Sequence, residues 1–343
     1  MVKTADGEEI FVVDGHVALW DGSVANQKNR HGAEFIDCFY DYHRNLSPKE
    51  WLWPHDKFIH YDEQTFIHDV FEEGSVDVAI FQPVGLTDFY KEPFGNVAKN
   101  YALAQKYPGR LIGNGYFDPR DGEEGLERLE QWAKDYHLQG VKLYTAEWHG
   151  SSKGYRLADP WTQRYLAKCL QLGIRNIHVH KGPTIKPLNM DAFDVSDVDD
   201  AASAFPELNF IVEHVGLPRL EQFCWIATQD PNIYAGLAVA DAFIYTRPRY
   251  FAQIISELLY WLNEDRIVFG SDYALWHPKW LIDMFLNFEL PEDIAQETGV
   301  QLTKDIKKKI LGLNAARLYQ IDVPARISEL QHDVIGQRVH QAG

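Results

Sequence analysis

The sequence predicts a single (β/α)8 TIM barrel with an aromatic-rich insertion after the first strand. Its 343 residues suit one such barrel with insertions. Apolar runs typical of buried strands alternate with helical patterns along the chain. Four of these runs, widely separated in sequence, end in a histidine or an aspartate. Because a parallel barrel opens the C-terminal ends of all its strands on one face, we expect these side chains to converge there.

Eight segments have the length and the β-branched or aromatic content of strands. They are residues 10–13, 76–82, 110–117, 138–144, 174–180, 210–214, 232–239 and 267–272. Helical patterns lie between them, for example at 123–136, 161–172 and 248–263. In the first of these, Leu126, Leu129 and Trp132 recur at spacings of three among charged residues, which predicts one apolar helix face. These alternations favour the barrel.

The connection after the first strand, residues 17–75, is too long for an ordinary loop. It is too aromatic to be disordered, with Phe35, Phe39, Tyr40, Tyr42, Trp51, Trp53, Phe58 and Tyr61. Two interpretations stay open: a cap over the barrel mouth, or a contact between subunits. We assign residues 1–323 to the barrel with this insertion. The polar tail 324–343 is expected to lie on the surface or on a partner subunit.

Composition narrows the class of protein. A hydrophobic content of 45% provides a large core, and a net charge of −17 disfavours binding to nucleic acid or to anionic membranes. The three cysteines, Cys38, Cys169 and Cys224, form no CxxC pair, so no disulfide framework or thiolate zinc site is predicted. With no signal-peptide pattern and no apolar run approaching the ~20 residues of a membrane span, we expect a cytoplasmic location.

The four strand ends supply candidate metal ligands and catalytic groups. Asp14 and His16 are two residues apart on a strand and therefore point to the same face. Together with His180 and Asp272 they offer nitrogen and oxygen donors that suit Zn²⁺ or Mn²⁺. Asp272 can also accept a proton, and His214 is a ligand, an acid/base or a core residue, with acid/base favoured. Considered singly, each residue has an alternative to metal binding: Asp14 could cap a turn, and His16 could be a hydrogen-bonded core histidine.

Further polar residues lie on or just beyond the predicted strands. His178 is expected to be structural because it lies deeper in its strand than His180. A carboxylated Lys142 could bridge two metal ions, but Lys142 is expected instead to point inward and pair with a carboxylate. We therefore expect a single metal ion. Cationic or hydrogen-bonding groups near the barrel mouth are candidate substrate contacts, with exposure to solvent as the alternative: Lys181, Glu147, Arg247 and His277.

Several motifs together resemble the amidohydrolase superfamily, in the amidohydrolase-related branch that includes aminocarboxymuconate-semialdehyde decarboxylase and γ-resorcylate decarboxylase. They cover nearly the whole chain: Val13-Asp14-Gly15-His16-Val17, Gly115-Tyr116-Phe117-Asp118-Pro119, Gly140-Val141-Lys142-Leu143-Tyr144, His178-Val179-His180, Glu213-His214-Val215-Gly216, Phe269-Gly270-Ser271-Asp272-Tyr273 and Asn314-Ala315-Ala316-Arg317-Leu318-Tyr319. Many members carry His-x-His on the first strand, whereas this chain has Ala18 in place of the second histidine. The resorcylate-type pattern is more similar. It implies Asp14, His16, His180 and Asp272 as ligands, His214 as acid/base, and a homodimer.

The resemblance implies a metal-dependent decarboxylase that releases CO₂ from an aromatic or unsaturated carboxylic acid. One divalent metal is expected, Zn²⁺ first and Mn²⁺ second, with a small-molecule carboxylic acid as substrate. Two alternatives remain. One is a metal-dependent hydrolase of a lactone, amide or C–C bond. The other is a catalytically degraded barrel that serves as an accessory or metal-handling partner of another enzyme, which the substitution at Ala18 permits.

Overall fold

The computed structural model describes residues 1–4 and 6–342. Its strands are β1 (Val2–Lys3), β2 (Glu9–Ile10), β3 (Val13–Val17), β4 (Val78–Phe81), β5 (Leu111–Gly113), β6 (Gly115–Tyr116), β7 (Gly140–Leu143), β8 (Asn176–His180), β9 (Asn209–Glu213), β10 (Ile233–Gly236) and β11 (Ile267–Val268). Its helices are α1 (Arg30–Leu46), α2 (His55–Ile59), α3 (Glu63–Ile67), α4 (Val97–Lys106), α5 (Gly122–Tyr136), α6 (Pro160–Gln171), α7 (Asp197–Ala204), α8 (Leu220–Gln229), α9 (Phe243–Thr246), α10 (Pro248–Leu262), α11 (Pro278–Asn287), α12 (Glu292–Thr298), α13 (Lys304–Lys308), α14 (Asn314–Leu318), α15 (Val323–Gln331) and α16 (Val334–Ala342), and His68–Glu73 and Lys309–Leu313 are π-helical.

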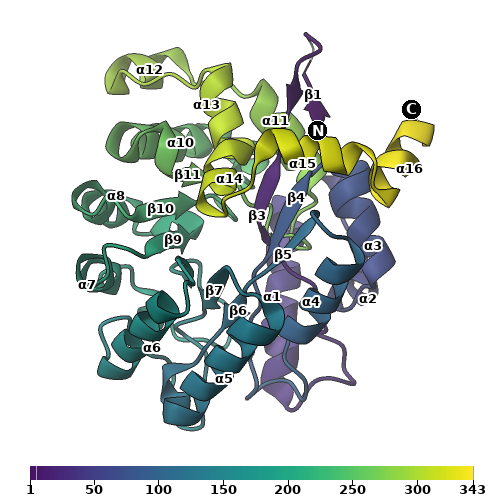
Figure 1. Ribbon diagram of the computed structural model, residues 1–343. Coiled ribbons are helices and arrows are strands. Elements are labelled where there is room, and N and C mark those ends of the chain that lie inside the picture. The colour runs from purple at the N-terminus through teal and green to yellow at the C-terminus, as the bar shows by residue number, and fades with distance from the viewer. Residues whose placement is uncertain (5, 343) are drawn as a thin grey trace.

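The predicted barrel is confirmed. Parallel strands form the orders β3-β4-β5 and β6-β7-β8-β9-β10-β11, with helices outside them (Figure 1). Only Asn114 separates β5 from β6 in the chain. On the other side, the Gly15 amide donates to the carbonyl of Phe269 (3.0 Å) and the Ala18 amide to that of Tyr273 (2.7 Å). These bonds connect β3 to the segment after β11, so the first and last strands of the barrel lie side by side.

Buried strands and amphipathic helices account for this arrangement. Every residue of β3, β7 and β8 is buried, as expected when helices cover a parallel sheet. The predicted helices at 123–136, 161–172 and 248–263 correspond to α5, α6 and α10, and Leu126 and Leu129 of α5 are buried. Strand register then sets the neighbours at the barrel mouth. His178 pairs with Lys142 across β7 and β8, and His180 pairs with Glu213 across β8 and β9.

The insertion after β3 contains α1, α2, α3 and the π-helical segment. Its aromatic residues form a continuous packed group around Trp20, whose ring stacks on Phe94 at 5.7 Å and meets Phe58 edge-on at 5.2 Å. The indole nitrogen of Trp20 donates to the carbonyl of Phe58 (2.9 Å). On α1, the Tyr42 hydroxyl donates to the carbonyl of Thr184 in the loop after β8 (2.9 Å). The insertion therefore touches the loops at the C-terminal ends of the strands.

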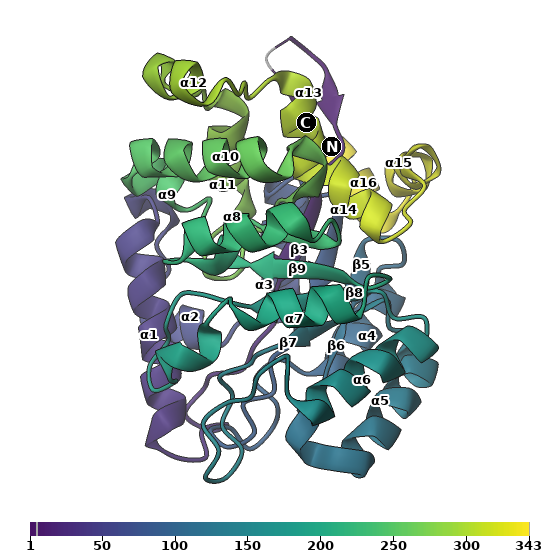
Figure 2. The ribbon, with the colours of Figure 1, turned by 90° about the vertical axis from the view of Figure 1, so that its left-hand side faces the viewer.

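The C-terminal segment lies at the opposite end of the barrel. In both views α15 and α16 are far from α1 (Figures 1 and 2). The Arg110 guanidinium, at the start of β5, pairs with Asp333 between α15 and α16 (2.6 Å). Leu330 and Ile335 are buried against the barrel. The segment predicted as a polar tail therefore includes two helices that pack on the N-terminal ends of the strands. No helix in the described part of the chain is long and apolar enough to cross a membrane.

Candidate active site

A cavity of about 40 Å³ lies at the C-terminal ends of the strands. The predicted convergence occurs here, because His16, His180, His214 and Asp272 all line it. Its remaining polar wall comes from Gln82, Lys142 and Tyr144, and its apolar wall includes Ala18, Trp20, Phe39, Tyr42, Phe94, Leu275 and Trp276. The insertion, β3, β7, β8 and the segments that follow β4, β9 and β11 all contribute to these walls.

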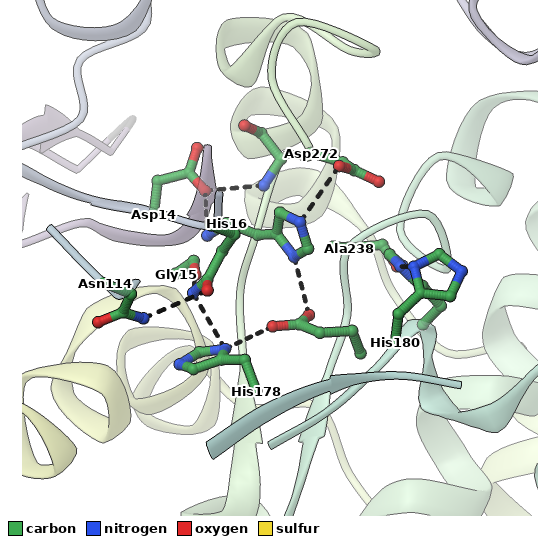
Figure 3. Close-up of polar contacts among 12 residues, drawn as sticks. Asp14, Gly15, His16, Asn114, His178, His180, Ala238 and Asp272 are labelled. Carbon is green, nitrogen blue, oxygen red and sulfur yellow. Dashed lines mark hydrogen bonds and ion pairs between the residues drawn. The ribbon is translucent and has the colours of Figure 1, made fainter. Parts of the chain in front are cut away.

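His16 lies between two carboxylates. Its Nδ1 is 3.0 Å from Glu213 Oε2, and its Nε2 is 3.4 Å from Asp272 Oδ1 (Figure 3). Burial would raise the pKa of Glu213, but the charges of His16 and Lys142 hold it well below its usual range. Glu213 is therefore ionised and faces Nδ1 of His16. Nε2, the other ring nitrogen of His16, faces Asp272.

Behind Glu213 a buried hydrogen-bonded chain fixes the carboxylate. Glu213 Oε1 is 2.5 Å from His178 Nδ1, and His178 Nε2 is 2.8 Å from the Tyr319 hydroxyl. The Asn114 amide donates to both Tyr319 (2.8 Å) and Gln82 (3.2 Å). His178 thus lies deeper than His180 and supports the carboxylate rather than the cavity. Buried polar groups linked in this way hold one geometry.

His180 and His214 contact each other through one hydrogen bond. Because the Ala238 carbonyl can only accept, His214 Nδ1 donates to it (2.8 Å), and His214 Nε2 is left as an acceptor. His180 Nδ1 lies 2.9 Å from His214 Nε2, and His180 Nε2 lies 3.2 Å from the carbonyl of Pro183. Burial holds the pKa of both imidazoles well below the usual value, so both are neutral. A neutral His180 has a single N–H, which it donates either to His214 or to the Pro183 carbonyl.

The backbone at the two catalytic candidates is left-handed. Asp272 has φ 55° and His214 has φ 65°, and Val215 follows with φ 48°. A β-branched residue in this region is an outlier, and such strain is concentrated at functional sites. Burial raises the pKa of Asp272, and Glu213 adds to the effect, while His16 and Lys142 oppose it. The carboxylate of Asp272 therefore binds a proton more readily than that of an exposed aspartate.

The environment of Lys142 differs from the one expected from the sequence. Its side chain was expected to pair with a carboxylate, but its Nζ has no hydrogen-bond partner among the residues that the structure describes. Only 1% of the residue is exposed, and it lines the cavity. Burial lowers its pKa, against the attraction of Glu213 and Asp272. A buried ammonium without a partner is costly for the fold, which indicates a functional reason for its retention.

Asp14 is buried behind the cavity wall. Its Oδ1 accepts from the amides of Ser271 (2.9 Å) and His16 (3.1 Å). Its Oδ2 is buried without a hydrogen-bond partner within residues 1–4 and 6–342. Burial raises the pKa of Asp14 to about 6. Asp14 thus connects β3 to the segment that carries Asp272, and its carboxylate lies outside the cavity lining.

Two of the four predicted substrate contacts are engaged elsewhere. The Lys181 ammonium is 2.6 Å from Asp197, and both side chains are almost fully buried. Arg247 is exposed, with its guanidinium 4.4 Å from the centre of the Tyr250 ring. The reason in each case is a local partner that a sequence pattern does not reveal. Both cations lie away from the cavity.

The other two predicted contacts are also outside the cavity. Glu147 Oε1 accepts from the Thr87 amide (3.3 Å), and burial raises the pKa of this carboxyl to about 8. His277 caps α11, where its Nδ1 accepts from the Lys279 amide (3.2 Å). Conversely, Lys142, Glu213 and Gln82 surround the site without having been proposed for it. The sequence signal that could have found Glu213 is its position directly before His214 at the end of a predicted strand, and the register places it opposite His180.

The sequence matches the family described as Amidohydrolase over residues 13–321. The chain belongs to this amidohydrolase family. It is an enzyme fold of that superfamily, with the site at the barrel mouth, where barrel enzymes carry their chemistry. No curated protein matches the chain by sequence.

Solved structures confirm the barrel at low sequence identity. An uncharacterised TIM-barrel protein from Bordetella bronchiseptica is 17% identical, with a TM-score of 0.66 over 93% of this chain and 100% of that one. A zinc-bound amidohydrolase from Burkholderia multivorans is 15% identical and has a TM-score of 0.60. The match covers 90% of this chain and 99% of that one. A third similar structure is a 5-carboxyvanillate decarboxylase from Novosphingobium aromaticivorans with bound manganese and 3-methoxy-4-hydroxy-5-nitrobenzoic acid. It is 14% identical and has a TM-score of 0.56, and the match covers 94% of this chain and 100% of that one.

Proposed function

We propose that this amidohydrolase-family chain is a metal-dependent, non-oxidative decarboxylase of an aromatic or unsaturated carboxylic acid. The observation that carries the proposal is the unpartnered Lys142 ammonium in a cavity with aromatic walls. A carboxylate or phenolate oxygen is the natural partner for a buried cation, and flat rings suit walls such as Phe94 and Trp276. The structural similarity to a decarboxylase of a benzoic acid agrees with this substrate class.

The donors at His16 and Asp272 fit a divalent metal. Two ligands of one tetrahedral zinc ion lie roughly 3.3 Å apart, since each is about 2.0–2.1 Å from the ion. The 3.4 Å between His16 Nε2 and Asp272 Oδ1 matches this spacing, and Glu213 supplies the carboxylate that orients a metal-bound histidine. No third donor completes this pair within 4.8 Å in the described chain. His180, whose Nε2 lies 3.2 Å from the Pro183 carbonyl, would turn away from that carbonyl toward the pair when metal binds, and Asp14 would hold the Asp272 segment.

A bound Zn²⁺ or Mn²⁺ would polarise the substrate carboxylate and a neighbouring oxygen. Lys142 would neutralise a second oxygen of the same group. Asp272 would donate a proton to the carbon that bears the carboxylate. The C–C bond electrons would return to the ring or double bond as CO₂ leaves, and water would reprotonate Asp272. His214 stays an alternative proton carrier, because its Nε2 becomes available once His180 moves away.

The insertion would act as a cap. The cavity of about 40 Å³ holds only a few water molecules, whereas a pocket for a small organic ligand occupies roughly 300 Å³ or more. A substrate can enter only if the walls separate. We place the opening between α1 and the loop after β8, where Tyr42 donates to the Thr184 carbonyl at the surface. A homodimer and a cytoplasmic location remain part of the proposal.

The second candidate is hydrolysis at the same site, with Asp272 as the base for an attacking water. The similarity to a zinc-bound amidohydrolase favours it. The two reactions differ in their products. A decarboxylase releases CO₂ and installs a solvent proton on carbon, whereas a hydrolase installs a water oxygen in the product.

The decisive experiment combines metal analysis with isotope labelling. Metal-free protein is reloaded with Zn²⁺ or Mn²⁺ and incubated with hydroxybenzoic and unsaturated acids in D₂O and in H₂¹⁸O. CO₂ release with one deuterium on carbon would support the decarboxylase, and ¹⁸O in the product would support the hydrolase. No metal uptake and no turnover would contradict both and favour the accessory-protein alternative.

A further inference from the structure

A second group of donor side chains lies outside the barrel mouth cavity. Among the described residues, His68, Asp69 and Glu73 place one ligand atom each within 4.8 Å of the others. All three belong to the π-helical segment His68–Glu73, which follows α3 in the insertion. The Asp69 side chain is buried, whereas 58% of His68 and 44% of Glu73 are exposed. One imidazole and two carboxylates form a donor set that suits Zn²⁺.

The buried imidazole of His277 provides a second, independent indication. Its side chain is 6% exposed, and its Nε2 has no hydrogen-bond partner among the described residues. Because Nδ1 accepts from the Lys279 amide, the neutral ring carries its proton on Nε2. This N–H points at the cluster, with Glu73 Oε2 at 3.4 Å. It is placed to donate to Glu73 once that carboxylate turns toward an ion.

A hydrogen bond from a different element fixes the remaining carboxylate. The Tyr273 hydroxyl donates to Asp69 Oδ2 (3.0 Å), which leaves Oδ1 on the side of His68 Nδ1, also at 3.0 Å. Such donors behind the ligands are typical of metal sites because they hold the ligand oxygens in place. The cluster opens into a cleft of about 970 Å³, so a hydrated ion can reach it.

We propose that His68, Asp69 and Glu73 bind a divalent transition metal, best represented by Zn²⁺, with His277 and Tyr273 holding the carboxylates. Water completes the coordination from the cleft. The ion connects the insertion to the segment after β11, because Tyr273 and His277 both belong to that segment. It is separate from the ion proposed between His16 and Asp272, and it stabilises the attachment of the cap rather than taking part in the reaction.

The test uses the full chain, stripped of metal and titrated with Zn²⁺ in a calorimeter, in a background where the barrel-mouth donors are removed by His16→Ala and Asp272→Asn. This background is expected to bind about one zinc ion per chain. Adding His68→Ala and Glu73→Gln should abolish the binding. Adding Glu72→Gln instead should not, because Glu72 lies in the same cleft but pairs with Arg338 (3.0 Å).

A second readout covers the case in which the barrel-mouth variant fails to fold. In the otherwise native chain, Zn²⁺ should raise the melting temperature of the Glu72→Gln variant more than that of the His68→Ala, Glu73→Gln variant, in which only the barrel-mouth donors are left to bind the ion. The proposal is overturned if the background variant folds and binds no zinc, or if the cluster substitutions leave stoichiometry and melting temperature unchanged. Since the barrel-mouth donors are absent from the first titration, failure of the proposed decarboxylase site would not affect its outcome.

Discussion

Oε2 of Glu213 lies 3.0 Å from Nδ1 of His16, with both side chains almost fully buried. The contact connects β9 to β3 and determines which imidazole nitrogen faces Asp272. The orientation of the His16 ring, which the sequence pattern does not give, therefore depends on Glu213.

Glu213→Gln should weaken metal binding. The neutral amide no longer holds the proton on His16 Nδ1, so Nε2 is less well presented and less basic. We expect the dissociation constant of the barrel-mouth metal to rise about 10–100-fold. Competition with a chelating dye measures this constant, and Glu221→Gln on the exposed face of α8 is the control. An unchanged constant would mean that Glu213 has only a structural role.

Lys142→Met should remove the anchor for an anionic substrate while keeping the side-chain length. We expect kcat/KM to fall about 10²–10³-fold, as for loss of a buried group that stabilises developing charge. The melting temperature should not fall, because the variant buries no unpaired ammonium. Steady-state kinetics and calorimetry check the two parts, with the exposed Lys99→Met as control. Full activity in the variant would remove Lys142 from the site.

Asp272→Asn should remove the proton donor and one carboxylate of the metal site with little change in shape, so turnover is compared at saturating metal. We expect turnover to fall about 10²–10⁴-fold, the usual contribution of a general acid or base. Deuterium should appear on the product carbon of the wild-type reaction in D₂O. The matched control is Asp283→Asn on α11, whose carboxylate pairs with Lys279 (2.5 Å). If Asp272→Asn keeps the wild-type rate, His214 becomes the proton donor to test next.

Tyr42→Phe should loosen the contact between α1 and the loop after β8. The change deletes the hydroxyl that donates to the Thr184 carbonyl and leaves the ring in place. We expect faster amide hydrogen exchange in residues 183–189. Tyr40→Phe is the control, because the Tyr40 hydroxyl donates to the Trp53 carbonyl within the insertion (3.1 Å). Equal exchange in both variants would place the opening of the cap elsewhere.

Glu147 should make stability pH-dependent. Burial raises its pKa from 4.5 to about 8. Below pH 4.5 the Glu147 carboxyl is protonated in both the folded and the unfolded chain. As the pH rises, this carboxyl ionises first in the unfolded chain, which lowers the free energy of unfolding until about pH 8. Glu147→Gln should remove this loss and stabilise the protein at pH 8 by about 1–4 kcal/mol. Denaturant unfolding at pH 5 and pH 8 measures it, with the exposed Glu207→Gln as control. A pH-independent difference between wild type and Glu147→Gln would show that the carboxyl ionises normally.

The sequence by itself determined the order of strands and helices and the four strand ends that meet at the barrel mouth. These features depend on local patterns, namely apolar runs and helical spacing. The two-residue period predicted Asp14 on the same face as His16, but the Asp14 carboxylate lies outside the cavity lining, where the strand register is irregular. Parallel strands in one barrel then bring His16, His180, His214 and Asp272 together whatever the details of packing. For the same reason, the motifs along the chain were enough to indicate the family.

Only the tertiary structure decided which atoms face one another. It turned Asp14 toward the Ser271 amide, left Lys142 without the expected carboxylate, and paired Lys181 with Asp197. It also brought the π-helical segment His68–Glu73 next to His277, about 200 residues away in sequence. Ion pairs and hydrogen bonds act through space over a few ångströms, and residues far apart in sequence come that close only after the whole chain has folded.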